Sequence, residues 1–404
     1  MLLRTVLILA LAFPSFARTL YVAPGGRDTN RGTRAAPFAT ISKGVAVLRA
    51  GDELVVRGGV YRESVTIWQK SNVRIRGAGK PVIEGNVSIG ESAGVRFDSF
   101  EVRNGPKSGI AVYDARDVKV RWNEVHHHQE FGIHVASAHE SPIGTTRDIV
   151  IEGNSVHHNV LSNAARTASS GWGQAIGAFR ARNVTIRGNF VRENYGEGID
   201  LVVTDRGRIV DNTVWDNFSV NIYLDNATCA TVDRNFVITG WSKDAKSFYR
   251  GGGPAMGIHA ANEKYAQQNL LKELTITNNI VVHCRFGFSY TDSGVRSGLR
   301  QTIVSNNAFV RPTDLALYIE GDRHSQTRIV NNIFYANGTD YTHARSTSIA
   351  YASNCWYGGK PGSEKRGTDD VYADPQFIDP YSAEKDDFKV RPSSPCRAQA
   401  PRLQ

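Results

Sequence analysis

Hydrophobic and polar positions along this chain follow a repeat. Four segments align without gaps, each with alternating apolar residues, a polar turn and a second apolar run: GIAVYDARDVKVRWNEV, AIGAFRARNVTIRGNFV, GIDLVVTDRGRIVDNTV and NIYLDNATCATVDRNFV. An Asn lies fourteen residues after the first position of every segment. Asn189, Asn212 and Asn235 follow one another at intervals of 23 residues. The chain is therefore built from a unit of 23 residues.

A unit of this length predicts the fold class. It has room for two or three short strands but not for a crossover helix, and it cannot bury its apolar face alone, so it must stack on copies of itself. Parallel strands joined by short turns form a coil, and the general hand of parallel connections is right-handed. The sequence predicts an all-β protein, a single-stranded right-handed parallel β-helix, which is a solenoid.

The side-chain period of two along a strand separates the inside of the coil from the outside. It places these apolar pairs inside: Ile110/Val112, Ile133/Val135, Ile199/Leu201, Ile222/Leu224 and Leu317/Ile319. The recurring Asn residues are expected to stack at the turns, where their amides bond along the axis. Two such ladders are predicted, one through Asn154, Asn189, Asn212 and Asn235 and one through Asn159, Asn194 and Asn217.

Both ends of the chain depart from the repeat. Residues 1–17 have a basic residue, an apolar run and a small-x-small ending, the layout of a signal peptide, so we expect a secreted or periplasmic protein. Residues 18–404 are expected to form one β-helix domain, with an N-terminal cap region over 18–65 that contains a helix over 42–49. Residues 369–404 are expected to form an irregular C-terminal tail. No later stretch approaches the roughly 18 apolar residues of a membrane span.

Two segments carry a family resemblance. LYVAPGGRDTNRGTRAAPFATISKGVAVLRAGDELVVRGGVYRESV (Leu20–Val65) and YADPQFIDPYSAEKDDFKVRPSSPCR (Tyr372–Arg397) resemble the opening and the close of exported pectate-lyase-like right-handed β-helix proteins, including family-nine polysaccharide lyases. The resemblance implies this fold over nearly the whole chain. It does not imply one reaction, because the superfamily includes lyases, hydrolases, epimerases and non-catalytic adhesins.

The same resemblance implies a metal. In the lyases, acidic residues of a D-D-G-x-D stretch bind calcium, and a lysine on a neighbouring coil is the base. The corresponding stretch here is GEGID, in which Glu197 and Asp200 match in charge and Gly196 departs from the pattern. Tyr223 stands where the lysine is expected. Calcium at Glu197 and Asp200 is therefore one expectation, and no cofactor is the other.

Polar and titratable residues concentrate in one column of outward-facing positions. Residues one position after the inward Ile stack at ~4.8 Å per coil. In chain order they are Ala111, His134, Gly177, Asp200, Tyr223, His259, Ser289 and Tyr318. Asp225 lies on the same face, two residues after Tyr223, which places its backbone about 8 Å from that of Asp200. His134, Asp200, Tyr223, His259 and Asp225 are the candidate catalytic residues.

Insertions between the coils supply candidate binding residues, because loops on a rigid scaffold usually carry binding. They fall near residues 136–148, 159–174, 238–256 and 260–273. Aromatic rings can stack on sugars and basic groups can meet carboxylates, and the residues that offer them are Trp172, Trp241, Lys243, Lys246 and Arg250.

The net charge of the chain narrows the choice of binding partner. The formal net charge is +9, or +8 without Arg4 of the leader. For an exported protein a basic balance favours an acidic polysaccharide over nucleic acid. We expect a monomer. The four cysteines allow three disulfide pairings, and the sequence does not choose among them.

These residues fit several functions. The leading prediction is a polysaccharide lyase that cleaves a uronate-containing polymer by β-elimination, with Tyr223 and His259 as base and acid and Asp200 tuning one of them. The first alternative is a glycoside hydrolase that uses Asp200 and Asp225, since inverting enzymes hold their carboxyls roughly 6.5–9.5 Å apart. A uronan epimerase and a non-catalytic glycan-binding β-helix are the others.

Overall fold

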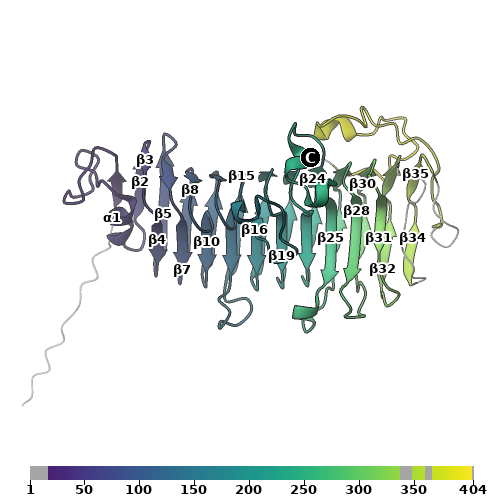
Figure 1. Cartoon of the computed structure of the whole chain (residues 1–404), viewed down its shortest axis with the longest axis horizontal. Coiled ribbons are helices and arrows are strands. Elements are labelled where there is room, and N and C mark those ends of the chain that lie inside the picture. The colour runs from purple at the N-terminus through teal and green to yellow at the C-terminus, as the bar shows by residue number, and fades with distance from the viewer. Residues whose placement is uncertain (1–16, 337–347, 360–365, 403–404) are drawn as a thin grey trace, which may run out of the picture.

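The fold is a stack of coils along one long axis. The computed structural model of the 404-residue chain describes residues 17–336, 348–359 and 366–402. The coils run from helix α1 at the N-terminal end to strands β34 and β35 at the other end (Figure 1). The middle coils contribute one strand to each of three sheets, named A, B and C, the terminal coils to fewer, and every strand-to-strand pairing within the sheets is parallel. This is the predicted parallel β-helix.

Sheet A has 13 described strands: β1 (Thr19–Val22), β2 (Glu53–Arg57), β5 (Ser71–Ala78), β8 (Ala93–Asp98), β11 (Arg116–Arg121), β14 (Arg147–Glu152), β17 (Arg182–Arg187), β20 (Arg208–Val210), β23 (Thr231–Asp233), β26 (Thr275–Thr277), β29 (Ile303–Ser305), β32 (Thr327–Val330) and β34 (Ile349–Ala352). Sheet B has 12: β3 (Val60–Tyr61), β6 (Val82–Glu84), β9 (Glu101–Arg103), β12 (Glu124–His126), β15 (Ser155–His157), β18 (Phe190–Arg192), β21 (Thr213–Trp215), β24 (Phe236–Ile238), β27 (Ile280–Val282), β30 (Ala308–Val310), β33 (Ile333–Tyr335) and β35 (Cys355–Tyr357).

Sheet C has 10 described strands, and it is the sheet that carries the outward column: β4 (Val65–Trp68), β7 (Val87–Gly90), β10 (Ile110–Tyr113), β13 (Ile133–Ala136), β16 (Gln174–Phe179), β19 (Glu197–Val202), β22 (Val220–Asp225), β25 (Met256–Asn262), β28 (Phe286–Asp292) and β31 (Leu315–Ile319). The inside of the coil is filled by stacked aliphatic side chains. Ile199, Ile222 and Ile258 are paired in register on successive strands and are fully buried. All the apolar pairs predicted to face inward are buried.

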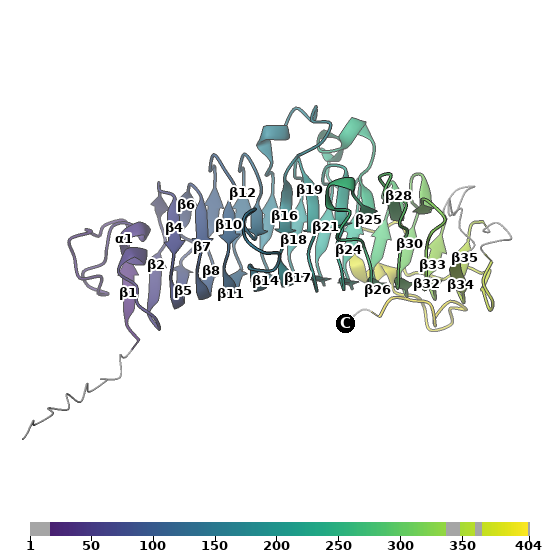
Figure 2. The same ribbon diagram turned by 90° about the horizontal axis from the view of Figure 1, so that it is seen from below.

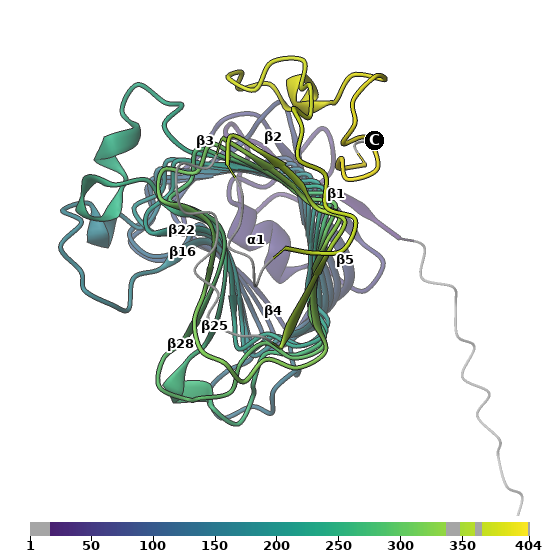
Figure 3. The same cartoon turned by 90° about the vertical axis from the view of Figure 1, so that its right-hand side faces the viewer.

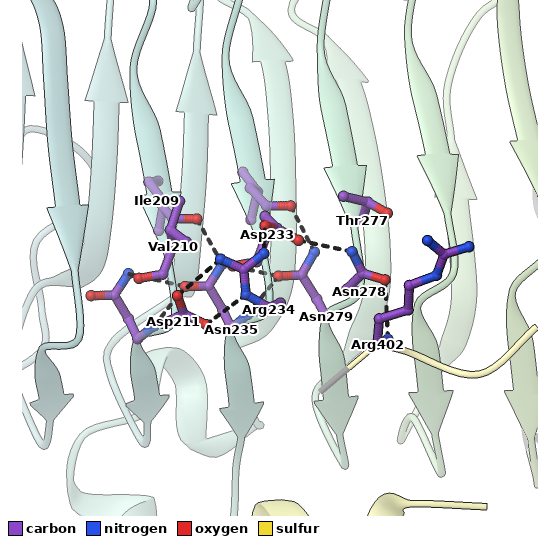
Figure 4. A network of polar contacts seen from close by, with 12 residues as sticks. Ile209, Val210, Asp211, Asp233, Arg234, Asn235, Thr277, Asn278, Asn279 and Arg402 are labelled. Carbon is purple, nitrogen blue, oxygen red and sulfur yellow. Dashed lines mark hydrogen bonds and ion pairs between the residues drawn. The ribbon is translucent and has the colours of Figure 1, made fainter. Parts of the chain in front are cut away.

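The two predicted Asn ladders are confirmed. The first continues beyond the prediction, from Asn123 to Asn354, and each amide nitrogen donates to the side-chain oxygen on the next coil. Asn235 donates to Asn279 at 2.9 Å, and the two amides lie in line in Figure 4. These residues are fully or almost fully buried, so the ladder satisfies polar groups that water does not reach.

Helix α1 (Ile41–Ala46) lies across the N-terminal end of the coil, as the view along the axis shows (Figure 3). The predicted helix over 42–49 is therefore present but shorter. It starts after Thr40, whose side chain accepts a hydrogen bond from the backbone of Lys43 and so caps the first turn. Ile41 and Val45 are buried against the first coils.

The C-terminal tail runs back along the outside of sheet B (Figure 1). Its 3₁₀ helix η6 (Lys385–Phe388) buries Phe388 against Phe236, and a disulfide between Cys355 and Cys396 ties the tail to β35. Cys229 and Cys284 are free. The predicted signal peptide, apart from Ala17, lies outside the described residues. Among the described residues no helix has the length and apolar character needed to cross a membrane.

Three insertions surround the middle of sheet C. The first, residues 158–173, contains η1 (Leu161–Asn163), and the second, residues 239–255, contains η2 (Ala245–Ser247) and η3 (Arg250–Gly252). They project side by side near β16, β19 and β25 (Figures 2 and 3), and Arg166 donates to the carbonyl of Lys246 across them. The third, residues 263–274, contains η4 (Lys264–Ala266) and leaves β25 at its other end.

Candidate active site

A cleft of about 730 Å³ lies over the middle coils of sheet C. Its floor comes from β16, β19, β22 and β25. Its walls come from the three insertions, which contribute Trp172, Arg250, and Glu263 with Tyr265. The predicted insertion between β13 and β14 contributes no residue to the lining.

The outward column of the cleft floor has the predicted register. Asp200 is paired with Tyr223, and Tyr223 with His259, on three successive strands. Asp225 is paired with Val202, two positions along the strand from Asp200, so the predicted spacing of about 8 Å between the Asp200 and Asp225 backbones holds. All four of these side chains line the cleft.

Four carboxyl groups meet in this cleft, those of Glu197, Asp200, Asp225 and Glu263. The Gln174 side chain donates to Glu197 at 3.2 Å. The hydroxyl of Tyr265 donates to one oxygen of Asp225, whose other oxygen is buried and makes no hydrogen bond.

Asp200 differs from the other three acids. Its side chain is only 1% exposed, and neither carboxyl oxygen has a described partner within ordinary hydrogen-bond geometry, although the Glu197 carboxyl and the Gln174 amide are close enough to act on its pKa. Buried polar groups normally have partners, and catalytic roles are among the recognised reasons for exceptions. Asp200 is therefore the strongest single candidate for chemistry in the cleft.

Glu197 and Asp200 share the cleft although strict alternation would put residues three apart on opposite faces. Gly198 lies between them against the backbone of the next coil. A Cβ there would approach the carbonyl oxygen of Asn221 to 2.3 Å, which only glycine avoids. The alternation of side chains breaks at this close approach, at the start of β19. As a result the Glu197 side chain lies in the cleft.

Burial and mutual repulsion make these acids hard to ionise. The pKa of Asp200 is well above its ordinary value because of burial first and then the charges of Glu197 and Asp225. Burial also raises the pKa of Glu197. For Asp225, burial raises the pKa to about 7, even though the hydrogen bond from Tyr265 favours the charged form. Such shifts cluster at functional sites.

The raised pKa of Asp225 predicts a pH-dependent cost in stability. An Asp titrates near 3.9 in an unfolded chain, so Asp225 contributes to stability below about pH 4 and loses that contribution as pH rises through about 7. Asn does not titrate. The stability gain of Asp225→Asn over wild type should therefore be larger at pH 8 than at pH 4, by at most about 4 kcal/mol. Urea unfolding at the two pH values measures it, and an equal difference at both would contradict the shift.

Tyr223 does not have the environment of a base. Its hydroxyl donates to Glu263 at 3.0 Å, and its pKa is raised far above the ordinary value by burial and then by Asp225 and Glu263. The predicted role required a nearby cation to lower this pKa. Among the described residues no Lys or Arg contributes to the shift of this pKa, so Tyr223 is a hydrogen-bond donor to Glu263 here and its role as a base stays a prediction.

The two candidate histidines are neutral. His259 lines the cleft, with Nδ1 2.8 Å from the Ser289 hydroxyl and Nε2 3.2 Å from that of Thr291, and burial lowers its pKa to about 4. His134 packs between Phe131 and Phe179 and does not line the cleft. Burial lowers its pKa to about 4 as well.

The predicted binding residues divide into two groups. Trp172 and Arg250 come together in the cleft wall, where the guanidinium lies 4.8 Å from the centre of the indole ring. Lys243 and Lys246 instead line a separate hollow on the second insertion, and Trp241 lies outside the cleft with 46% of its surface exposed.

Asp216 anchors the second insertion to the β-helix. Its buried carboxylate accepts hydrogen bonds from the backbone nitrogens of Gly240, Trp241 and Ser242 and from the Tyr249 hydroxyl. These bonds fix the start of the loop at Trp241 and, through Tyr249, the segment that presents Arg250. No repeat position singles out Asp216, so the sequence analysis did not identify it.

Glu263 and Tyr265 were also missed. Both come from the third insertion, which the sequence analysis located but could not orient. The available signal was composition, an acid and a tyrosine two residues apart directly after a strand of the outward column.

The cleft does not assemble a complete calcium site. Calcium takes six to eight oxygen ligands. Among the described residues no group of three or more His, Cys, Asp or Glu side chains has the arrangement to hold a metal ion. Although Asp200 has unpartnered oxygens, the described residues do not offer the ligand set that the implied calcium needs.

Comparisons with known proteins agree with this architecture. YwoF of Bacillus subtilis (strain 168), an uncharacterized protein, is 25% identical to this chain in an alignment 461 positions long. The alignment covers 94% of this chain and 92% of YwoF. The structure of pectate lyase Pel9A superimposes with a TM-score of 0.55 at 15% identity, over 96% of this chain and 90% of that one. A rhamnogalacturonan lyase gives 0.52 at 12% identity, over 90% and 91%.

These structural similarities support the fold, since identities this low carry no further information. A family model described as "Right handed beta helix region" matches residues 57–294, more than half of the chain, and the match includes β19 and β22 with their carboxyl groups and β25 with His259. The predicted right-handed, pectate-lyase-like β-helix is thus confirmed. The chain belongs to the right-handed beta helix family.

Proposed function

We propose that this protein is a carbohydrate-active enzyme, a glycoside hydrolase that cleaves a glycosidic bond with Asp200 and Asp225. The observation that carries the proposal is the Asp200 carboxyl, buried at the cleft floor, without a hydrogen-bond partner and hard to ionise. Glycosidases need one carboxyl that stays protonated until it protonates the leaving oxygen. Export, in line with the leader-like residues 1–17, is part of the proposal.

Asp225 is the complementary base. Its pKa of about 7 lets it accept a proton near neutral pH, and one of its oxygens accepts no hydrogen bond from the described residues. In the proposed step Asp200 gives its proton to the glycosidic oxygen as the bond to the anomeric carbon breaks. Water adds to that carbon, and Asp225 takes the water proton. The strand register puts the backbones of the two residues about 8 Å apart, which leaves room for a water between carboxyl groups held at the roughly 6.5–9.5 Å of inverting enzymes.

The similarity to pectate and rhamnogalacturonan lyases keeps a lyase as the second candidate. β-Elimination on a uronate requires a cation to neutralise the substrate carboxylate and a base for the carbon-5 proton. Among the described residues that line the cleft, Arg250 alone carries a formal positive charge, against four acids. The charge balance therefore favours hydrolysis over elimination.

Product analysis tests the proposal. A panel of neutral, amino-sugar and uronate oligosaccharides is incubated with the protein in ¹⁸O-labelled water. Hydrolysis is expected to release reducing ends that carry the label, with inversion at the anomeric carbon and without new ultraviolet absorbance. Products that absorb in the ultraviolet and carry no label would establish the lyase instead.

A further inference from the structure

The four acids of the cleft are not paired with cations. Among the described residues neither Glu197, Asp200, Asp225 nor Glu263 forms a salt bridge, and the hydrogen-bond donors that meet three of them are the neutral side chains of Gln174, Tyr223 and Tyr265. Arg250 stacks on Trp172, and its charge only partly offsets the raised pKa of Glu197.

A buried Asp elsewhere in the fold shows that the lack of salt bridges to buried acids is specific to the cleft. Asp98 in sheet A is 1% exposed, as Asp200 is, but its carboxylate accepts hydrogen bonds from both Arg74 and Arg121. The fold thus supplies two paired cations to a buried acid elsewhere, whereas the four acids of the cleft have a single Arg250 beside them among the described lining residues. Buried acids without cations are neutralised by protons or by a positively charged ligand.

Aromatic side chains surround the same acids. Tyr223, Tyr265 and Trp172 line the cleft, and Tyr223 and Tyr265 donate directly to two of the carboxyls. A cation is attracted both by carboxylates, through charge-assisted hydrogen bonds, and by aromatic faces. A uronate would instead bring a fifth carboxyl group into the cleft. The expected acidic polysaccharide is therefore a poor match to this site.

We infer that the cleft selects a glycan that carries a protonated amine, an amino sugar, and disfavours a uronate. The inference rests on the proposed function, in which a glycan occupies this cleft, and it names the substrate class. The net charge of +9 opposes it only weakly. Charges farther away than the Debye length, about 8–10 Å, are largely screened, whereas the four acids line the cleft itself.

Matched oligosaccharides test the inference. Binding of the glucosamine trisaccharide, its N-acetylated counterpart and the galacturonate trisaccharide is measured by titration calorimetry at pH 6. The amine is expected to bind about tenfold or more tightly than the N-acetyl compound, as charge-assisted contacts allow. A cation favours ionised carboxyls, so binding should also release protons, read from titrations in two buffers of different ionisation enthalpy.

The substitution Glu263→Gln tests the contribution of the carboxylate charge with little change in the shape of the side chain. Gln still accepts the hydrogen bond from Tyr223 but carries no charge, so amine affinity should fall about tenfold and by clearly more than N-acetyl affinity. Asp244→Asn is the control, since Asp244 is an exposed acid of the second insertion that does not line the cleft. It should change neither affinity.

Three outcomes would overturn the inference: equal or tighter binding of the N-acetylated or galacturonate compound, no effect of Glu263→Gln on the amine, or tight binding of calcium alone that excludes it. The proposed function is judged separately. Hydrolysis of neutral oligosaccharides without amine preference would leave the hydrolase standing. Amine binding without cleavage of any oligosaccharide would refute only the hydrolase.

Discussion

Glycosidic bond cleavage is expected to slow by a factor of roughly 10²–10⁴ when Asp200 is replaced by Asn, the usual contribution of general acid catalysis. Asn has nearly the same shape and cannot donate the proton. Because Asp200 has no hydrogen bond to lose and is costly to ionise where it is buried, Asp200→Asn should be at least as stable as wild type at neutral pH. Initial rates with the oligosaccharide identified in the panel, and urea unfolding, measure both effects.

Asp98→Asn is the matched control for this result. Asp98 is equally buried, but it is paired with Arg74 and Arg121 in sheet A, and it does not line the cleft. Removing its charge should destabilise the fold, because breaking a buried ion pair leaves its partners uncompensated, while the rate of cleavage stays unchanged. If Asp200→Asn instead lost stability and kept its rate, Asp200 would be a structural residue.

The part of the site that the sequence could predict is the part fixed by the repeat. Asp200, Tyr223 and His259 stand in register because parallel strands set the spacing from coil to coil. The interval of 23 residues reveals the equivalence of Asp200 and Tyr223, and the repeated pattern of small and apolar residues around His259 reveals its place after an insertion. The same reasoning located the inward core and the Asn ladders. Local periodicity decides these placements, so no knowledge of distant contacts was needed.

The roles of the same residues could not be predicted, because the insertions set them. Tyr223 was assigned as a base on the expectation of a nearby cation, yet the third insertion brings Glu263 to its hydroxyl. Trp241 and Arg250 lie nine residues apart on one loop. That loop is hydrogen-bonded to Asp216, which lies more than twenty residues earlier in the chain. In the loop held this way, Arg250 lies in the cleft and Trp241 lies outside it. Such non-local contacts leave no periodic signal.

Replacing Asn212 by Ala is expected to cost roughly 3–5 kcal/mol of folding free energy, because each buried polar group left without a partner costs about 1–3 kcal/mol. The Asn212 amide donates to the carbonyls of Ile186 and Val210 and to the Asn235 side chain at 2.9–3.1 Å. Its oxygen accepts from both nitrogens of Asn189. One truncation therefore disrupts bonds on three coils, and equilibrium urea unfolding measures the loss.

Thr213→Ala provides the comparison one residue further along the chain. Thr213 begins β21, is partly exposed, and its side chain makes no hydrogen bond to the described residues, so the change should stay below about 1 kcal/mol. A loss at Asn212 no larger than this would mean that water or neighbouring amides replace the missing bonds. A large loss at Asn212 alone would instead identify the buried ladder as what holds successive coils in register. The alignment of Asp200 with Tyr223 and His259 on the outer face depends on that register.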